Sequence, residues 1–531
     1  MSSNAKSPKL SNYLSGQWQE GKDDGVALFD PVTGEELRRA SSTGLDIGGA
    51  LNWSRTEGGK NLLAMGYSAR AEMVGKIADV LAANKDKYYE ISQKNLGATV
   101  GDNAFDIDGG IFTLKSYARA GKNLGNGAFL KEGAVIPLSK ENKFEGQHYL
   151  MPMRGVAVFI NAFNFPSWGL WEKAGPALLS GMPVFVKPAT PTAWLTQEMV
   201  ADVIAAGVVP AGALSIVCGG ARDLLDHVNE NDVVSFTGSA DTARTIKSHP
   251  AVIANAVRVN IEADSVNAAI LGPDATPGTP EFDFAVKEIV REMTVKAGQK
   301  CTAIRRIIVS KQNADALGQA IVAKLSTTKV GNPRNEATRM GPLVSKAQQQ
   351  SAIEGIALLK TECQVLIGDT PLNLIDATAD QACFIAPTLL RCDLGVKAKV
   401  ANDVEVFGPV ATIIPYENTA DAIAIARRGR GSLVASVFSG DENFCQELIP
   451  NIADLHGRIM VVDAKVEGQQ TGHGNVMPNC LHGGPGKAGG GEELGGLRAL
   501  TLYHRRMVVQ AGPHRTSALS SLANDAAPLF N

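Results

Sequence analysis

The feature that most constrains this chain is an alternation of short apolar runs with longer helical stretches. Continuous apolar runs of strand length occur at residues 156–160, 184–186, 214–217 and 233–236. Helical patterns lie between them, at residues 171–179 and 196–206. Short apolar strands that alternate with helices predict βαβ units and a parallel sheet. Ligands of such sheets bind where the strands reach their carboxyl ends.

A second alternation begins near residue 267 and predicts a second α/β unit. Strand-like runs at 268–271 and 304–309 flank a helical pattern at 281–297. Because 531 residues exceed what one hydrophobic core usually organises, two large domains are expected. Further expected elements are a helix over 67–96 and strands at 13–14, 26–29 and 499–503, the last after a glycine-rich loop that begins near 475.

Composition fits this fold class and excludes several kinds of function. The net charge is -3, with no long run of one sign, so the sequence suggests no nucleic-acid partner. It has neither a secretory signal nor an apolar stretch of about 18 residues, so no membrane span is expected. The seven cysteines are scattered without a CxxC pair, which argues against a disulfide framework and a metal cluster. A reducing cytoplasm is the compartment that fits best.

Cys301 is the candidate nucleophile. It follows a helical run and Gly298, and Lys300 stands beside it. A nearby cation favours the thiolate, which is the nucleophilic form of cysteine. The alternative is inert packing, which is the more common role of a single cysteine.

Polar residues follow several of the predicted strands and supply further candidates. Each has an ordinary interpretation when taken alone: a turn residue, a solvated charge or a helix cap. Ser239 in Phe-Thr-Gly-Ser opens a helix, and a helix N-terminus with glycine and serine suits a phosphate. The candidates are Asn164, Lys187, Ser239, Glu262 and Glu405.

Taken together and in this order, the motifs resemble those of the aldehyde dehydrogenase superfamily over roughly residues 10 to 510. They are Asn-Phe-Pro (164–166), Lys-Pro-Ala (187–189), Phe-Thr-Gly-Ser (236–239), the Glu262 segment, Gly-Gln-Lys-Cys (298–301), Val-Gly-Asn-Pro (330–333) and Glu-Val-Phe-Gly-Pro (405–409). The resemblance implies the aldehyde dehydrogenase fold, an α/β architecture with three parts. These are a Rossmann-like NAD(P)-binding domain (1–131 and 153–267), a second α/β catalytic domain (268–497) and a small β oligomerisation arm (132–152 and 498–531).

The same resemblance implies a role for each catalytic candidate. Cys301 attacks the aldehyde carbon, and the oxyanion accepts hydrogen bonds from Asn164 and from the backbone N–H of the cysteine. Glu262 activates the water that hydrolyses the resulting thioester. Lys173 matches a lysine near the nicotinamide, and Glu493 matches a glutamate on the proton-exit side.

The resemblance also implies a nicotinamide cofactor. Lys187 should contact the adenosine ribose, Ser239 the pyrophosphate and Glu405 the nicotinamide ribose. Thr190 stands where many NAD-preferring members have a glutamate, and the missing carboxylate removes repulsion against a 2′-phosphate. We therefore expect NADP, with NAD possible, and a cation from Lys187 or Arg222. The full set of cofactor-binding candidates is Ile160, Ala162, Phe163, Lys187, Ala189, Thr190, Arg222, Thr237, Gly238, Ser239, Glu405 and Phe407.

Two positions depart from the family pattern. Ala263-Asp264-Ser265 follows Glu262 where the family usually has Leu-Gly-Gly, so this turn must be arranged differently. Glu172 stands where many members have an aromatic residue in the aldehyde tunnel. A carboxylate there is either a solvated helix residue or a polar contact to substrate, for example as a proton relay near Cys301.

Several further stretches narrow the resemblance to members that oxidise CoA-linked semialdehydes in the aerobic breakdown of aromatic acids. They lie at residues 106–112, 161–173, 471–475 and 503–506. The expected reaction converts the aldehyde at the far end of an acyl-CoA to a free carboxylate, in benzoate catabolism. The corresponding phenylacetate enzyme carries an added C-terminal hydratase, for which this chain leaves no room. That semialdehyde and a generic aldehyde remain alternative substrates.

Two other activities and the assembly state are left open by the sequence. A CoA-acylating dehydrogenase would not need Glu262, which argues against that chemistry. A non-catalytic structural relative would not need Cys301, Glu262 and Asn164 together. By resemblance, we expect a homodimer that pairs through the arm, and a tetramer built from two such dimers stays possible.

Overall fold

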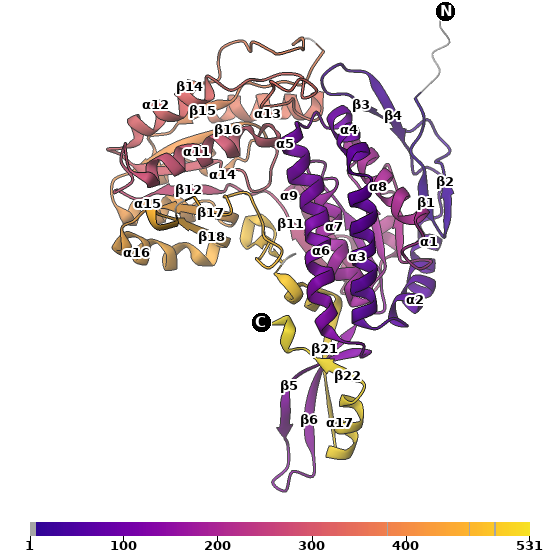
Figure 1. Ribbon diagram of the computed structural model, residues 1–531. Coiled ribbons are helices and arrows are strands. Elements are labelled where there is room, and N and C mark those ends of the chain that lie inside the picture. The colour runs from indigo at the N-terminus through magenta and orange to yellow at the C-terminus, as the bar shows by residue number, and fades with distance from the viewer. Residues whose placement is uncertain (1–6, 380, 467, 493–494, 531) are drawn as a thin grey trace, which may run out of the picture.

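The structure, a computed structural model, describes residues 7–379, 381–466, 468–492 and 495–530 (Figure 1). Its first seven-stranded sheet has the order β11-β10-β7-β8-β9-β1-β2. The five strands β7 to β11 run parallel, and β1 is antiparallel to β9, which confirms the predicted βαβ units. The strands are β1 (Asn12–Leu14), β2 (Gln17–Gln19), β7 (Ala157–Ile160), β8 (Val184–Lys187), β9 (Leu214–Ile216), β10 (Val233–Thr237) and β11 (Arg258–Glu262).

Helices cover both faces of this sheet. On one face α3, α6, α7 and α8 share an apolar core with the strands, and on the other α1, α9 and α10 do so. The predicted helix over 67–96 is two helices, because Asn84 leaves helical geometry with φ -107° and ψ 14°. The helices are α1 (Ile47–Trp53), α2 (Gly59–Leu63), α3 (Tyr67–Ala83), α4 (Lys85–Asn95), α5 (Val100–Asn103), α6 (Gly109–Gly121), α7 (Trp168–Ser180), α8 (Ala193–Ala205), α9 (Ala240–Lys247) and α10 (Pro250–Ala254). A ribbon of β3 (Val26–Phe29) and β4 (Glu36–Ala40) lies beside them.

The second seven-stranded sheet has the order β14-β15-β16-β13-β12-β17-β18 and is parallel except for β14. Its strands are β12 (Ala268–Leu271), β13 (Arg306–Ser310), β14 (Gln364–Ile367), β15 (Thr388–Arg391), β16 (Val410–Tyr416), β17 (Ser432–Phe438) and β18 (His456–Val462). Its helices are α11 (Pro280–Thr294), α12 (Ala314–Leu325), α13 (Lys346–Leu359), α14 (Val400–Asp403), α15 (Thr419–Arg427) and α16 (Glu442–Ile452). The predicted helix at 281–297 therefore ends early, because Lys296 and Ala297 take left-handed φ values of 53° and 50°.

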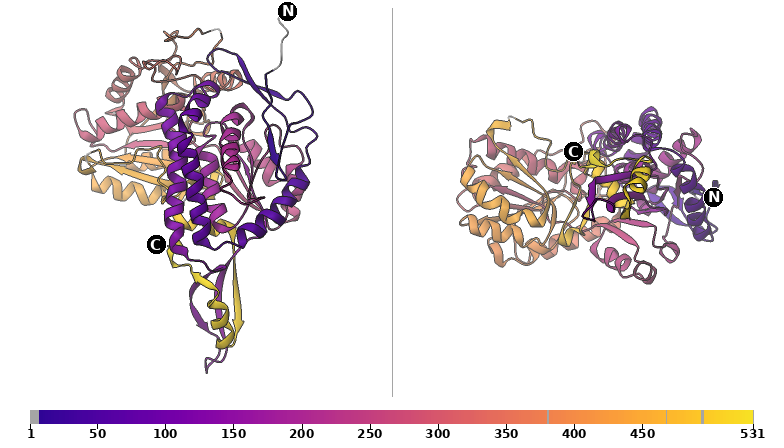
Figure 2. Two further views of the ribbon diagram at one scale, coloured as in Figure 1. Left: turned by 45° about the vertical axis from the view of Figure 1, so that its right-hand side comes forward. Right: turned by 90° about the horizontal axis from the view of Figure 1, so that it is seen from below.

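A four-stranded sheet of order β21-β6-β5-β22 projects from the body (Figures 1 and 2). It comprises β5 (Phe129–Pro137), β6 (Glu145–Pro152), β21 (His504–Ala511) and β22 (Ala523–Asp525), with α17 (Pro513–Ser520) packed on it. The expected strand at 499–503 is wrong. This segment belongs to a 3₁₀ helix, Gly496–Tyr503, whose Ala499, Leu500 and Tyr503 are buried beside the long helices. Strand pairing begins only at His504.

The glycine-rich segment is an ordered connection between the two large sheets. Its strands β19 (Gly483–Gly484) and β20 (Gly491–Glu492) pair with each other and lie against β11 and β17. A Cβ atom at Gly489 would lie 2.4 Å from the carbonyl oxygen of Ile261. Glycine is therefore required where this segment passes the end of β11, the strand that carries Glu262.

Candidate active site

The candidate residues gather where the strands of the first sheet reach their carboxyl ends. Glu262 is the last residue of β11, and its register partner Thr237 ends β10. Ile160 and Lys187 are register partners at the ends of β7 and β8. The parallel sheet thus brings together residues that are about a hundred positions apart in the chain, as the sequence predicts.

The nucleophile loop leaves α11 through a sharp left-handed turn. Gly298 has φ +68°, and a Cβ atom there would lie 2.1 Å from the carbonyl oxygen of Gly408. The buried Arg305 guanidinium donates to the carbonyl oxygens of Gly298, Lys300 and Gly408 at 2.9, 3.2 and 2.7 Å. The backbone around Cys301 is therefore held on both sides by hydrogen bonds.

Asn267 connects the nucleophile loop to the turn that follows Glu262. It is fully buried, and its Nδ2 donates to the carbonyl oxygens of Cys301 at 2.7 Å and Ala303 at 3.1 Å. Its Oδ1 accepts from Ser265 Oγ at 2.7 Å and from the N–H of Val434 at 3.1 Å. Sequence reasoning missed Asn267. The one signal that could have revealed it is the position of a polar residue directly before a buried strand.

The unusual turn Ala263-Asp264-Ser265 is arranged by hydrogen bonds in place of glycines. The N–H of Ala263 donates to the carbonyl oxygen of Ala488 at 3.0 Å. Asp264 Oδ1 accepts from the N–H of Ala240 at the start of α9, at 3.1 Å. The N–H of Ser265 donates to Glu405 Oε2 at 2.9 Å. This turn therefore links the base strand to the glycine-rich segment, to α9 and to the Glu405 loop.

His482 stands between the thiol and two carboxylates. Its Nε2 lies 4.0 Å from Cys301 Sγ and 3.5 Å from Glu262 Oε2, and its Nδ1 lies 3.0 Å from Glu172 Oε2. The imidazole is 3% exposed, and the Trp168 ring packs on it with centroids 4.9 Å apart. Sequence reasoning missed His482, because within a glycine-rich stretch it carried no spacing signal.

Glu172 is not a solvated helix residue, so that alternative is wrong. It is 1% exposed and pairs with His482, and its Oε1 lies 3.7 Å from Lys173 Nζ. Lys173 Nζ also donates to Thr237 Oγ1 at 2.8 Å. A buried carboxylate is stable only with such partners. The position that is often aromatic in this family thus belongs to a buried polar network next to Cys301.

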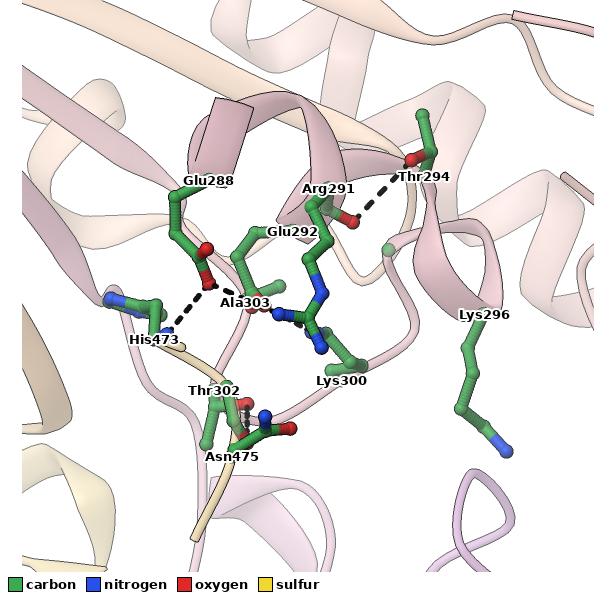
Figure 3. Close-up of polar contacts among 12 residues, drawn as sticks. Glu288, Arg291, Glu292, Thr294, Lys296, Lys300, Thr302, Ala303, His473 and Asn475 are labelled. Atoms are coloured by element: carbon green, nitrogen blue, oxygen red, sulfur yellow. Dashed lines mark hydrogen bonds and ion pairs between the residues drawn. The ribbon is translucent and has the colours of Figure 1, made fainter. Parts of the chain in front are cut away.

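The expectation that Lys300 favours the Cys301 thiolate is wrong. Lys300 Nζ binds Glu292 Oε1 at 2.6 Å, and both side chains are 1% exposed, so the ammonium is neutralised within a separate buried pair (Figure 3). Burial, and then the negative charge of Glu262, raise the pKa of the Cys301 thiol well above its usual value of 9.0. In the protein without ligands, the thiol is therefore the favoured form.

One cavity joins these catalytic groups to the predicted oxyanion donor. Asn164 is 5% exposed, and its Nδ2 donates to the carbonyl oxygen of Gln299, two residues before Cys301, at 3.1 Å. Glu493, the proton-exit candidate, lies outside the described residues. The cavity is lined by Ala162, Asn164, Glu172, Lys173, Thr237, Glu262, Cys301 and His482, among others.

The trio Glu262, Cys301 and His482 places one ligand atom from each residue within 4.8 Å of the others. Such a set has the composition of a zinc site, although the sequence predicts no metal. A thiol, an imidazole and a carboxylate in this arrangement also suit nucleophilic catalysis, with a base near the thiol. The family match below favours the second interpretation.

The residues expected to bind the cofactor fit a nicotinamide dinucleotide. Burial lowers the pKa of Lys187, whose ionisable neighbour is the Cys218 thiol. Glu405 Oε1 is buried and lies 3.6 Å from Nε of Arg305, and burial raises the pKa of Glu405 to about 7. An ammonium and a carboxylate are groups that can bind the ribose hydroxyls of a dinucleotide. Phe163 and Phe407 pack edge to face, with centroids 5.6 Å apart.

The adenosine end of the expected cofactor site holds hydroxyl groups and Arg222. Thr190 Oγ1 donates to the carbonyl oxygen of Gly219 at 3.3 Å. Arg222 contacts the hydroxyls of Ser42 and Thr43, and it pairs with Asp23 at 3.7 Å. The sequence pointed to Thr190 and Arg222, while the contribution of the Ser42-Thr43 turn appears only in the fold.

A second cavity, of about 170 Å³, also reaches Cys301. Its lining is largely aromatic and aliphatic, and Phe112 and Met477 are 52% and 38% exposed at its outer end. The other lining residues include Ala104, Phe105, Phe165, Trp168, Asn475, Val476 and His482. A long apolar chain can therefore approach the thiol through this tunnel.

The fold and this site define a dehydrogenase of aldehydes. The aldehyde dehydrogenase family model matches residues 18–506, and the chain belongs to that family. The oxidation that the family catalyses uses NAD or NADP. Within the described residues, the helices are too short or too polar to cross a membrane.

Among curated relatives, the chain is 65% identical to the 3,4-dehydroadipyl-CoA semialdehyde dehydrogenase of Aromatoleum evansii over 478 residues, covering 90% of this chain and 93% of the relative. It is 24% identical to a lactaldehyde dehydrogenase of Methanococcus maripaludis, covering 85% and 90%. The fold matches the solved structure of a 3,6-anhydro-L-galactose dehydrogenase with a TM-score of 0.82 and 23% identity, covering 95% and 100%. A betaine aldehyde dehydrogenase of Staphylococcus aureus in complex with NAD+ matches with a TM-score of 0.81 and 21% identity, covering 95% and 96%.

The raised pKa predicts how Cys301 reacts with iodoacetamide in the protein without cofactor. Alkylation should be slow at neutral pH and should accelerate as the pH rises toward the thiol pKa. Glu262→Gln removes one cause of the raised pKa and should therefore speed alkylation at about pH 8, on the order of tenfold. His482→Gln should slow it, because the group that can accept the thiol proton is lost.

Mass spectrometry of the alkylated peptide over time measures these rates. The matched controls Glu447→Gln and His514→Gln alter exposed residues and should leave the rates unchanged. A wild-type rate that stays constant from about pH 6 upward would contradict the raised pKa, since it would reveal a thiolate already formed.

Proposed function

We propose that this enzyme oxidises 3,4-dehydroadipyl-CoA semialdehyde, or a close CoA-linked semialdehyde of aromatic-acid catabolism, to the carboxylic acid with NADP. The observation that carries the proposal is the placement of Cys301 and Glu262 around His482, at the inner end of an apolar tunnel. The 65% identical relative from Aromatoleum evansii carries this substrate in its name. Benzoate catabolism is the corresponding metabolic setting, with the phenylacetate-derived semialdehyde as the nearest alternative.

The first half of the proposed mechanism forms the covalent adduct. His482 Nε2 accepts the proton of the Cys301 thiol, and the Glu172 carboxylate accepts a hydrogen bond from Nδ1 and stabilises the imidazolium. The thiolate attacks the aldehyde carbon, and the Asn164 amide donates to the oxyanion together with the N–H of Cys301. Each such donor held in place contributes about 3–4 kcal/mol to stabilising the transition state. The bound cofactor supplies the acceptor for the hydride that leaves the adduct carbon.

The second half of the mechanism hydrolyses the Cys301 thioester. Glu262 takes a proton from water, and the resulting hydroxide attacks the thioester carbon and releases the carboxylate and the thiol. A CoA-acylating enzyme would instead pass the acyl group to free CoA and would have no use for a buried carboxylate here. The position of Glu262 beside the thiol therefore favours hydrolysis.

Glu262→Gln tests hydrolysis directly. The adduct and the reduced cofactor should still form, because neither step uses Glu262, while deacylation should slow about 10²- to 10⁴-fold. Stopped-flow absorbance should show a burst of reduced cofactor close to one per active site, and mass spectrometry should find acylated Cys301. Glu447→Gln, an exposed glutamate, serves as the control. Full turnover by Glu262→Gln, or rescue of its turnover by added free CoA, would argue for the acylating reaction.

The preference for NADP is supported by Thr190, Lys187 and Arg222. Thr190→Glu would add a carboxylate where a 2′-phosphate is expected to lie, and it should lower kcat/KM for NADP about ten- to hundredfold while sparing NAD. Steady-state rates with both cofactors measure the ratio, and Thr361→Glu at an exposed helix end is the control. A wild-type enzyme that is as efficient with NAD as with NADP would contradict the preference.

We also propose that the four-stranded sheet joins two copies of the chain into a homodimer. Several apolar side chains of this sheet and of the turn before β6 are 41–44% exposed, which is unusual for residues that face only water: Val135, Ile136, Phe144, Met507 and Val508. Light scattering should give twice the mass of the chain for the wild type, and a lower mass for Val508→Asp. A monomeric wild type at micromolar concentration would refute the pairing.

A further inference from the structure

An open groove lies directly outside the tunnel that leads to Cys301. It has a volume of about 550 Å³ and shares Ala104, Phe105 and Asn475 with the tunnel, so the two spaces adjoin each other. Its walls are formed by α5 with the turn that follows it (99–105), by the end of α11 and by the 333–339 loop. Its further lining includes Thr99, Val100, Gly101, Asp102, Arg291, Val295, Pro333, Thr338 and Arg339.

The direction of the substrate follows from its chemistry. Its aldehyde carbon must reach Cys301, and its thioester lies at the other end of the carbon chain. The other cavity at Cys301 is lined by Lys173, Thr237 and Glu262, which lie beside the position expected for the nicotinamide. The CoA portion must therefore leave through the apolar tunnel, and the groove is the space into which that tunnel opens.

The groove carries two arginines that suit phosphate groups. The side chain of Arg291 is 43% exposed, and its nearest ion-pair partner, Glu288 Oε1, is 4.0 Å away. In Figure 3 the Arg291 side chain extends from α11 on the side where Asn475 and Thr302 lie. Arg339 is exposed, and its Nη1 is fixed by the carbonyl oxygens of Glu336 and Thr338 at 2.7 and 3.1 Å.

The acidic groups of the groove leave this positive charge available. Asp102 is 3% exposed, and its carboxylate accepts hydrogen bonds from the N–H groups of Thr99 and Lys296 at 2.9 and 2.7 Å. Glu288 accepts from the N–H of His473 at 2.7 Å. Glu336 is exposed at the rim. Phosphate oxygens bind guanidinium groups through paired charge-assisted hydrogen bonds, which an exposed carboxylate at the rim does not prevent.

From these observations we propose that the groove binds the phosphate-bearing nucleotide end of the CoA thioester, with Arg291 and Arg339 as the phosphate ligands. The apolar tunnel then holds the acyl chain and the pantetheine arm, and the walls at Val295 and Pro333 contact the nucleotide. This inference rests on the proposed substrate, because a simple aldehyde carries no phosphate. It assigns these arginines to substrate affinity and leaves the chemistry at Cys301 unaffected.

The test compares two substrates in the intact enzyme. The double variant Arg291→Ala/Arg339→Ala should raise KM for 3,4-dehydroadipyl-CoA semialdehyde about ten- to hundredfold and leave kcat and the KM for hexanal unchanged. Replacing Arg291 by lysine instead of alanine in this double variant should recover part of the lost affinity for the CoA substrate, because the positive charge is kept. Arg119→Ala, an exposed arginine of α6 outside the groove, is the matched control. Equal KM changes for both aldehydes, or none for the CoA substrate, would overturn the groove assignment.

A direct binding measurement separates this inference from the proposed function. Free CoA should bind the wild type by calorimetry without displacing NADP, and the double variant should bind it about tenfold or more weakly. Dephospho-CoA should bind less tightly than CoA if the 3′-phosphate is one of the groups held. If the wild type fails to oxidise the CoA semialdehyde yet binds CoA through these arginines, the substrate assignment falls and the groove assignment stands. CoA that binds equally well to both proteins, or to neither, overturns the groove assignment.

Discussion

The buried amide of Asn267 is the interaction on which the geometry of this active site depends. Its side chain bonds to the backbone of Cys301 and Ala303 on one side, and to Ser265 and Val434 on the other. The turn after the base strand, the nucleophile loop and strand β17 of the second sheet are therefore fixed to one another by a single residue. A buried amide left without partners costs about 1–3 kcal/mol for each lost group, so this arrangement resists distortion. The distance between Cys301 and Glu262 is set by the connection between the sheets.

The electrostatics around Cys301 follow from the same burial. The thiol faces Glu262 and Glu172 in a site with little water, and both carboxylates oppose a second negative charge. The neighbouring Lys300 cannot offset this, because its ammonium is held by Glu292. His482 is the group placed to accept the thiol proton, and its contact with Glu172 stabilises the charged imidazole. Such an arrangement favours the protonated thiol, which is the less reactive form of cysteine.

The sequence predicted those parts of the fold and site that depend on local pattern. The apolar runs became strands β7 to β11 because continuous apolar residues are what a sheet buried on both faces requires. The family motifs led to Cys301, Glu262 and Asn164, and the structure places all three around one cavity. The segment at 499–503 was misassigned because its apolar residues could serve either a strand or a helix, and only the packing against the long helices decides between them.

Other parts could not be predicted, because they depend on contacts between distant segments. His482 meets Glu172 across 310 positions of sequence, and Asn267 meets Cys301 across 34. The predicted effect of Lys300 on the Cys301 thiol was wrong for the same reason. A neighbour in sequence says nothing about where a long side chain points, and this one reaches Glu292 on the preceding helix. The turn Ala263-Asp264-Ser265 looked like a defect beside the glycines of the family pattern, and its side chains and backbone turn out to supply the bonds that hold it.

The two carboxylates beside Cys301 can be assigned different tasks from their hydrogen bonds. Both oxygens of Glu172 have charged or polar neighbours, His482 at 3.0 Å and Lys173 at 3.7 Å, so this group is committed to the network. Glu262 has an oxygen, Oε1, that is buried and lacks a hydrogen-bond partner among the described residues. A buried acceptor of this kind is unfavourable unless a water molecule fills it. This unsatisfied oxygen therefore favours Glu262, and not Glu172, as the base in the proposed hydrolysis.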